Sequence, residues 1–532
     1  MDDITGRFQY SFAVLPFVVL VYLLSHLLLH FLRDHSRIAV RGPCPWPICG
    51  NLPQLLKLFK NPDQELKRLS NQYGGITKLW LGSQPVLIIS RAKDAKALLD
   101  FKGSIYSDRP MQDSFRMRIW PFRVLGIGIN SPHFRMLRSV NHRLLSFEKS
   151  LQFCGYQEFE SVVMLQELLD FPNDFCIHSE RFSVSIMFSA IFGVRLVQLN
   201  HPTIKEFFEI WTEMLRYFQP GTLLVDYFPI LNKLPERFQP WLRLARDLQK
   251  RESDLYQAFL VTLKAQIRAG TAPACFASEF FKLKENEDCS DDKAIGIFGM
   301  LIGAGADAMT SVIQNFFKIM AMNPRALRAA QEELDRVVGR SRLPSWEDQK
   351  DLPYLRALIK EVHRWAPIGT LGVPHAASEE DPDLGIPKGT ILFPNLHALN
   401  RDPNVYENPD SFYPERFLGD DLDASASLNQ SDFRKRDHYH YGFGRRVCQG
   451  VFVAEASLYI AFSRIIWAFD ISTIPGAPPL DLDDKTPGLI TRPKPYSVRI
   501  EPRSDKARQV IQTAVSQTHS KIYDFDIVRA AE

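Results

Sequence analysis

The chain has 532 residues, of which 45% are hydrophobic and 12% aromatic. This is enough apolar material for a large buried core, in one big domain or two unequal ones. The 64 Lys and Arg residues face 61 Asp and Glu residues, a net charge of +3, which argues against a nucleic-acid-binding protein. The seven cysteines are scattered and odd in number, which excludes a disulfide scaffold and favours a reducing compartment.

The segment Phe12–Leu32 is mostly apolar and reaches the length of about 20 residues that crosses a bilayer core of roughly 30 Å. Arginines follow it, whereas two aspartates and a single arginine precede it. The positive-inside rule then places the following domain in the cytoplasm. A cleaved signal peptide is the alternative, but neither a charged n-region nor a small-residue cleavage site is evident. We therefore predict a single-pass membrane anchor.

The pattern after the anchor is mainly helical, with a smaller β portion. Alternating prolines in Gly42–Asn51 predict a stiff, extended spacer. Periodicity predicts helices over Asp292–Met322, Pro324–Arg340 and Val451–Phe469, strands within Ile76–Ile89, Val373–Phe393 and Tyr496–Ile500, and a polar surface loop over Gly419–Asp432. The sequence thus predicts a mainly α domain.

A glycine-rich segment, Tyr441–Gly450, contains a cysteine and leads into an apolar helix. Its glycines predict a tight loop whose backbone can approach a flat ligand. Cys448 is expected at the N-terminal end of that helix, where free N–H groups and the helix dipole lower the pKa of a thiol. Thiolate ligation donates electron density to haem iron and favours O–O cleavage. A thiolate in this position is suited to binding haem iron, and Arg445 and Arg446 could pair with haem carboxylates.

This segment resembles the haem loop of the cytochromes P450, Phe-x-x-Gly-x-Arg-x-Cys-x-Gly. Gly444, Arg446, Cys448 and Gly450 match its fixed positions, and Tyr441 stands where the pattern has Phe. The resemblance implies a P450 fold, haem b as the cofactor with these five residues around it, and Cys448 as the ligand of its iron. It also implies an oxidoreductase that acts as a monooxygenase.

The resemblance extends over nearly the whole chain and implies a division into four parts. These are the membrane anchor and its flank (1–41), the proline-rich hinge (42–51), the haem-thiolate catalytic domain (52–503) and a C-terminal tail without a clear role (504–532). Membrane-bound members of the family imply a location at the endoplasmic reticulum, with the catalytic domain in the cytoplasm.

Two further segments carry charges that the family uses together. Glu361 and Arg364 lie at i and i+3 on a predicted helix, so they can form a charge-assisted pair. On a helix surface such a pair is common and weak. In the family, a Glu-x-x-Arg helix and a later Pro-Glu-Arg-Phe segment form a buried network, and Arg416 would supply its third charge. The resemblance implies that this network braces the haem loop and that removing one member leaves the others unpaired.

The predicted helix Asp292–Met322 contains the small residues Gly303–Ala306. Small residues let another group approach a helix backbone. We expect that group to be a haem face and bound oxygen, although close packing between helices would explain the same pattern.

The same helix departs from the family at one position. Its pattern Ala/Gly-Gly-x-Asp/Glu-Thr is matched up to Asp307, but Ala308 replaces the threonine that helps deliver protons to oxygen. Thr310 lies about 200° around the helix and Ser311 nearly a turn away. We therefore expect a substrate hydroxyl or ordered water to complete the proton path, or a reaction that needs less proton delivery than hydroxylation.

Weaker matches imply that Arg138 and His375 bind the haem propionates. No flavin or nicotinamide fingerprint is evident, so the resemblance implies that NADPH acts through a separate flavoprotein, the NADPH-cytochrome reductase. The basic run Arg434–Arg436 is a candidate for docking its acidic surface, or else a solvated group of charges.

Three alternatives remain open at this stage. One is a non-haem metal protein that uses His438, His440 and Cys448, although a fourth ligand and the usual spacing are missing. Another is a haem-binding protein without turnover. The last is a haem-thiolate enzyme that catalyses rearrangement, coupling or desaturation.

The substrate pocket is expected to be mostly apolar, which suits a lipophilic small molecule. Its expected lining is Met111–Asn130, Phe207–Phe228, Leu301–Ala304, Pro367–Val373 and Leu489–Ile490. The motifs resemble those of fungal enzymes of secondary-metabolite biosynthesis.

Overall fold

The computed structural model describes residues 38–522 except 47–48, 61, 83, 111–118, 197–201, 219–221, 228 and 284–288. The predicted membrane anchor Phe12–Leu32 lies outside these residues, as do parts of the proline-rich hinge and of the expected pocket lining.

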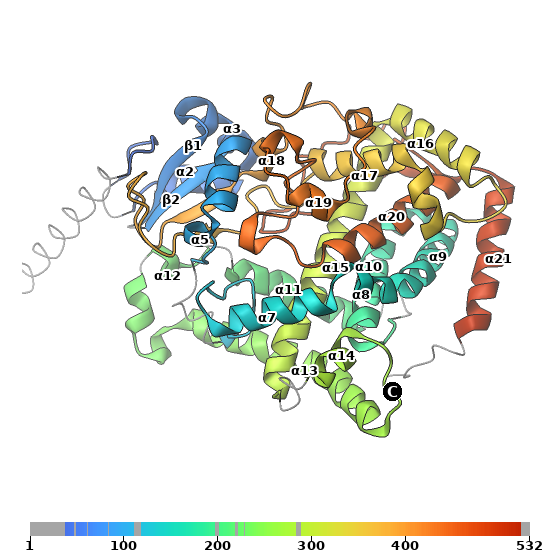
Figure 1. Ribbon diagram of the computed structural model, residues 1–532, viewed down its shortest axis with the longest axis horizontal. Helices are drawn as coiled ribbons and strands as arrows, with labels where there is room; N and C mark the ends of the chain where they lie inside the picture. The colour runs from blue at the N-terminus through green and yellow to red at the C-terminus, as the bar shows by residue number, and fades with distance from the viewer. Residues whose placement is uncertain are drawn as a thin grey trace, which may run out of the picture.

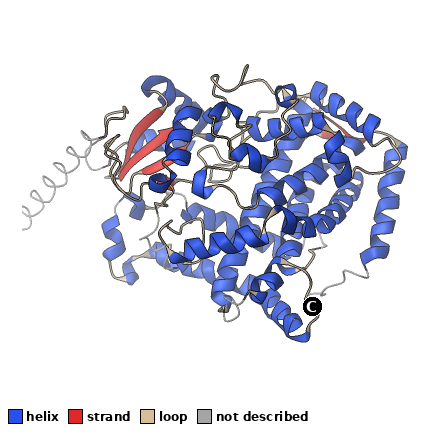
Figure 2. Ribbon diagram, viewed as in Figure 1, coloured by secondary structure: helices blue, strands red, loops and turns tan. Residues whose placement is uncertain are grey.

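Helices dominate the described chain, as the sequence predicts, and the strands gather mainly at one end (Figures 1 and 2). The longer helices are α2 (Leu52–Lys60), α3 (Pro62–Tyr73), α7 (Pro132–Leu144), α9 (Cys154–Asp170), α10 (Phe175–Phe192), α11 (Pro202–Phe218), α13 (Pro240–Ala269), α15 (Asp291–Met322), α16 (Pro324–Val337), α17 (Pro353–Trp365), α20 (Val451–Ala468) and α21 (Asp505–Ile522).

The larger sheet has four strands in the order β1-β2-β4-β3. Its strands are β1 (Ile76–Leu81), β2 (Gln84–Ile89), β3 (His375–Ala376) and β4 (Ile391–Pro394). β1 and β2 form an antiparallel hairpin, and β2 pairs in parallel with β4, which brings segments about 300 residues apart together. The strands predicted within Ile76–Ile89 and Val373–Phe393 are confirmed.

A second sheet pairs β5 (Phe469–Ser472) with β6 (Arg499–Pro502). The predicted strand at Tyr496–Ile500 therefore lies a few residues later, and β5 begins where the helix was expected to end. Residues along β5 alternate between buried and exposed. The apolar residues of α20 continue directly into this alternation. The sequence therefore does not show where the helical period ends and the two-residue period of a strand begins.

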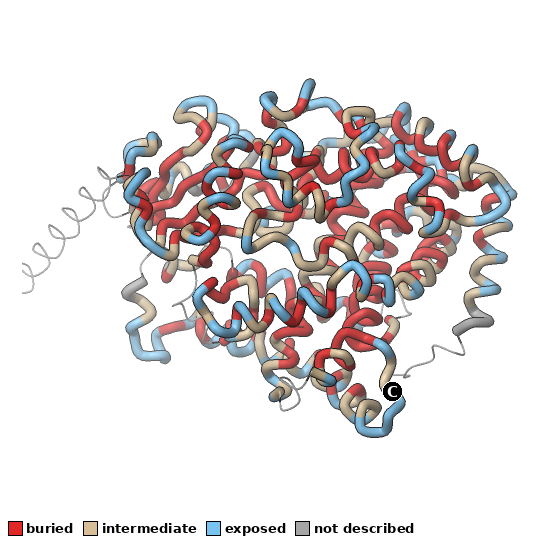
Figure 3. Tube along the Cα trace, viewed as in Figure 1, coloured by how far each residue is buried: buried red, intermediate tan, exposed pale blue. Residues whose placement is uncertain are grey.

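α15 is the central helix of the molecule, and most of its residues are buried (Figure 3). A side chain at Gly303 would overlap the ring of Trp211 on α11, and one at Gly305 would press on Met187 of α10. Close packing between helices therefore explains these two glycines, rather than the expected room for a haem face.

Two described helices, α15 and α20, are long and apolar enough to cross a membrane. Their most apolar windows are 72% and 78% buried inside the protein. They are therefore core helices of this domain, and their apolar character is not evidence that either helix spans a membrane.

The C-terminal tail contains a helix for which the sequence had suggested no role. α21 packs along α9 at the edge of the molecule (Figure 1). Ala507 and Ile511 are its buried contacts, so this helix extends the core rather than standing apart from it.

The packing of α15 predicts a destabilising effect of Gly303→Ala. Its methyl group would displace Trp211, and overpacking of this kind costs about 1–3 kcal/mol. Chemical denaturation of the purified protein should show that loss. The matched control is Gly155→Ala in α9, where an added Cβ meets nothing within 4 Å. It should be neutral or gain about 0.5–1 kcal/mol of helix propensity. Equal effects of the two substitutions would contradict this account.

Candidate functional site

The glycine-rich loop forms a tight turn immediately before α20. Gly442 and Gly444 have φ values of 78° and 48°, in the left-handed region that favours glycine. The Cys448 N–H donates to the Tyr441 carbonyl at 2.9 Å. A side chain at Gly444 would collide with the carbonyl of Leu99. Glycine is therefore needed here for contact with the protein backbone, rather than for the expected approach to a flat ligand.

Cys448 is accessible although it lies deep in the protein. Its side chain is classed as exposed, yet burial raises the pKa of its thiol, outweighing the N–H of Gly450 and the charge of Arg138. Both observations hold if the sulfur faces an internal cavity. The expected lowering of the thiol pKa by the helix end is therefore wrong for the protein alone, and the thiolate needs the charge of a bound metal ion.

Four basic side chains gather in the interior beside this cysteine. They are Arg109, Arg138, His375 and Arg446. Burial lowers the pKa of Arg109 to about 9 and also depresses the pKa values of Arg138 and Arg446. Burial and the charge of Arg109 hold the pKa of His375 well below its usual value, so that ring is neutral.

These side chains are held mainly by backbone carbonyls. Arg446 donates to three of them at 2.5–3.2 Å, and Arg138 donates to Val447 at 2.8 Å. Within the described residues, Asp108 is the carboxylate whose charge acts on Arg109 and Arg446, and Arg109 Nε has no hydrogen-bond partner. Such unbalanced buried charge is costly.

The cluster therefore fits haem, whose two propionates would supply the missing negative charge. The sequence indicated Arg138, Arg446 and His375 but assigned no role to Arg109. No local pattern shows that the segment of Arg109 pairs with β3 through Asp108 and Ala376, or that Arg446 of the haem loop donates to the Ser107 carbonyl.

One stripe of α15 is partly accessible although the helix is otherwise buried. It comprises Leu301, Ala304, Gly305 and Ala308, which have the i, i+3, i+4, i+7 spacing of a single helix face. Ala308 is thus on the accessible face. Thr310 is buried and its hydroxyl has no partner among the described residues, while the Ser311 hydroxyl donates to the Asp307 carbonyl at 2.8 Å.

Asp307 points away from that stripe and is bound by two side chains that the sequence did not indicate. Trp211 Nε1 donates to it at 3.0 Å, and Arg492 Nε donates at 2.8 Å. Arg492 also bonds Glu180 of α10 at 2.9 Å. The carboxylate of Asp307 is therefore engaged in an ion pair and is not a free acid.

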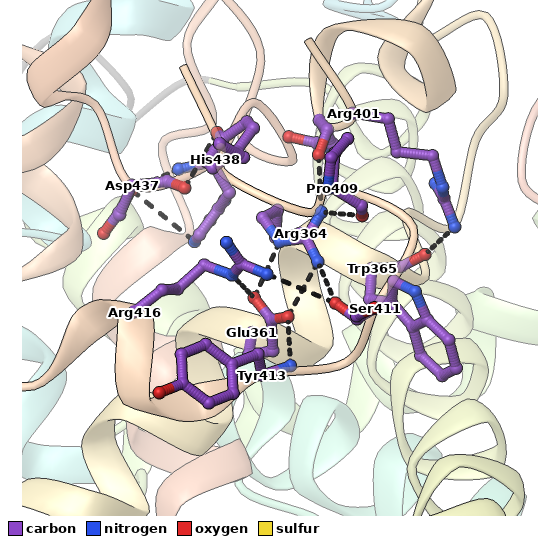
Figure 4. Close-up of polar contacts among 12 residues, drawn as sticks. Glu361, Arg364, Trp365, Arg401, Pro409, Ser411, Tyr413, Arg416, Asp437 and His438 are labelled. Carbon is purple, nitrogen blue, oxygen red and sulfur yellow. Dashed lines mark hydrogen bonds and ion pairs between the residues drawn. The ribbon is translucent and has the colours of Figure 1, made fainter. Parts of the chain in front are cut away.

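Glu361, Arg364 and Arg416 come together as one buried group (Figure 4). Arg364 donates to both Glu361 oxygens at 2.7 Å, and Arg416 Nε donates to Oε2 at 3.2 Å. Glu361 and Arg364 are fully buried. The Tyr413 N–H adds a bond of 2.7 Å to the same carboxylate.

This group connects to the haem loop through one residue. Arg364 donates to the Asn400 carbonyl at 2.8 Å, and the Asn400 side chain accepts from the Tyr439 N–H at 2.8 Å. The path leads from α17 to the residues just before the glycine-rich turn.

The basic run ahead of the loop is not wholly at the surface. Arg434 and Lys435 are exposed, but Arg436 is 2% exposed and donates to the carbonyls of His438 and Gly442. Inclusion of Arg436 in a docking surface was therefore wrong, because it stabilises the loop from inside.

The alternative metal site at His438, His440 and Cys448 is not supported. In the part of the chain that the structure describes, the side chains close enough to share an ion are His363, His438 and Glu455. Cys448 is not among them.

A cavity of about 1640 Å³ lies beside Asp307, and Cys448 is not among the residues that line it. Thr212 and Leu215 of α11 line it, as do Thr370–Gly372 and Leu489–Arg492. It thus includes parts of three of the segments expected to line the pocket, but not Leu301–Ala304 or the described part of Met111–Asn130.

Comparison with known proteins identifies the family. The family described as Cytochrome P450 matches residues 40–500. Cytochrome P450 monooxygenase polD of Polytolypa hystricis is 52% identical over 94% of this chain and 97% of its own. The monooxygenases fogE of Aspergillus ruber and virE of Hypocrea virens are each 34% identical over 88% of this chain, covering 88% and 86% of their own lengths.

The matched region contains every element described around Cys448, and membership of this family implies a haem cofactor. The resemblance seen in the haem loop is thereby confirmed for the chain as a whole. The chain belongs to the cytochrome P450 family and is a monooxygenase, an oxidoreductase.

Proposed function

We propose that this protein binds haem b through Cys448 and oxidises a lipophilic small molecule with O₂ and electrons that NADPH provides through a reductase. One observation carries the proposal: an accessible interior thiol lies beside a cluster of arginines for which Asp108 is the described carboxylate partner. When bound, thiolate-ligated haem supplies the activation of O₂.

The protein's own residues then have separable roles. Arg109, Arg138 and Arg446 bind and orient the carboxylates, with neutral His375 as a hydrogen-bonding partner. The network of Glu361, Arg364 and Arg416 supports the loop that presents the sulfur. Tyr441, Gly444 and Gly450 shape that loop.

The position of Ala308 bears on how protons arrive. A methyl group on the accessible face of α15 neither donates nor accepts a proton, and Asp307 is engaged by Arg492. A substrate hydroxyl or a water must therefore complete the path. The same observation favours the second candidate: rearrangement, coupling or desaturation, in which proton demand differs. Membership of a family of monooxygenases argues against the alternative of a haem protein without turnover.

The similarity to fungal monooxygenases supports a place in secondary-metabolite biosynthesis. We further propose that Phe12–Leu32 anchors the catalytic domain to the cytoplasmic face of the endoplasmic reticulum. Exposed Arg434 and Lys435 remain candidates for contact with the reductase.

Cys448→Ala should abolish the strongly red-shifted Soret band of the dithionite-reduced, CO-treated protein, because the band requires thiolate ligation. Difference spectra of membranes that contain wild type and variant test this. Persistence of the band without Cys448 would refute the assignment.

Arg138→Gln should weaken haem binding by about tenfold, since it removes one charge-assisted partner of a carboxylate. The rate of haem transfer to an excess of apo-globin measures this. Arg135→Gln, on the exposed side of the same helix, is the matched control and should transfer haem at the wild-type rate. Equal rates for all three proteins would argue against the propionate role.

Ala308→Thr should raise the ratio of product to NADPH consumed when the substrate has no hydroxyl group of its own, because it introduces a proton relay on the accessible face. Ala308→Val has the same branched shape without the hydroxyl and should not raise the ratio. If threonine and valine act alike, steric change and not proton delivery explains the effect.

A further inference from the structure

Behind the haem loop, three side chains from separate elements meet around one carboxylate. The Tyr441 hydroxyl donates to Glu455 Oε1 at 2.5 Å, and His363 Nε2 lies 3.3 Å from the same oxygen. Glu455 is on α20 and His363 on α17, while Tyr441 is the loop residue that stands where the family pattern has Phe. The hydroxyl that Phe lacks is thus the group that contacts Glu455.

The carboxylate of Glu455 is ionised in this setting. Burial works to raise its pKa, but the hydrogen bond and charge of His363 and the hydrogen bond from Tyr441 hold it below its usual value. The Tyr441 hydroxyl is the donor in its contact with Glu455 Oε1. The result is a partly buried carboxylate that Tyr441 and His363 contact through the same oxygen.

The other end of Tyr441 contacts the iron ligand. Its carbonyl accepts from the Cys448 N–H at 2.9 Å. Tyr441 is therefore fixed at two points, at the hydroxyl by Glu455 and at the carbonyl by the cysteine. Any shift of the hydroxyl end is passed along a rigid side chain to the backbone that orients the sulfur.

A metal ion shared by His363, His438 and Glu455 would be another use of this cluster. The hydrogen bonds argue against it. Glu455 already has two partners, and His438 Nδ1 accepts from the His440 N–H at 3.3 Å, which leaves the proton on Nε2. A neutral imidazole can bind a metal only through an unprotonated nitrogen.

We propose that Glu455 is a positioning residue for the haem-thiolate centre. Acting through Tyr441, it fixes the backbone around Cys448, and its charge disfavours addition of an electron to the iron. This inference rests on the proposed binding of haem by Cys448.

The test is the reduction potential of the full-length holoenzyme, measured by spectroelectrochemistry, for wild type and two variants. Glu455→Gln keeps the shape but removes the negative charge, so the potential should rise. Tyr441→Phe removes one donor and leaves the carboxylate less neutralised, so the potential should fall. Tyr441→Phe restores the residue of the family pattern, which makes it the variant most certain to fold.

A second readout follows the sulfur itself. In both variants the reduced CO complex should convert from the thiolate-ligated to the thiol-ligated spectrum several-fold faster than in wild type. Ser457→Ala removes a buried hydroxyl from the same helix and is the matched control, which should leave both the potential and the conversion rate unchanged.

The possible outcomes are distinct. If wild type lacks the thiolate spectrum, the proposed function fails whatever the variants do. If wild type is normal and Glu455→Gln leaves the potential unchanged, or both variants shift it in the same direction, the inference fails. One equivalent of zinc in wild type that is lost in Glu455→Gln would also overturn it in favour of a metal site.

Discussion

Unbalanced positive charge in the interior is the constraint on which this structure depends. Arg109 is buried and Arg138 and Arg446 are partly buried near it, and Asp108 is the described carboxylate that acts on Arg109 and Arg446. Such an excess of positive charge in a protein interior is costly without an anionic partner. In the function proposed above, the carboxylates of haem would be that partner, and α7, β3 and the haem loop supply the residues that would hold them.

Different kinds of contact stabilise the two sides of the proposed haem site. On the side of the sulfur, polar contacts predominate: Glu361 and its arginines connect to the loop through Asn400, and Glu455 holds Tyr441. On the opposite side, α15 is packed closely by Trp211 and Met187. Hydrogen bonds fix direction, and close packing fixes shape.

The sequence predicted the parts of this site that depend on short spacing. Cys448 and its loop, the pair Glu361–Arg364 and the long helices α15 and α20 all follow from local patterns. Arg109, Arg492 and Trp211 could not be found in this way, because their partners lie about 100–300 residues away in the chain. Arg436 was misplaced for a different reason: its partners, His438 and Gly442, are close in sequence, but a run of basic residues has the same pattern whether it faces water or a turn.

The boundaries that failed have a similar cause. Phe469, the first residue of β5, was taken as the end of α20 because apolar residues continue across the junction, and only pairing with β6 defines the strand. Likewise, a local pattern cannot tell whether the glycines of α15 make room for haem or for a neighbouring helix. The positions of Trp211 on α11 and Met187 on α10 show that they make room for neighbouring helices.

The position of Arg492 in the chain has a consequence for how the protein is made. Glu180 and Asp307 lie in the first three-fifths of the sequence, yet the arginine that neutralises both comes 312 and 185 residues later. During synthesis on the ribosome, two carboxylates in neighbouring helices must wait for nearly the entire chain to emerge. Until then both carboxylates lack this cation, and a buried charge without a partner is costly. The ion pairs that join α10 and α15 to Arg492 can therefore form only after the cysteine loop has been made.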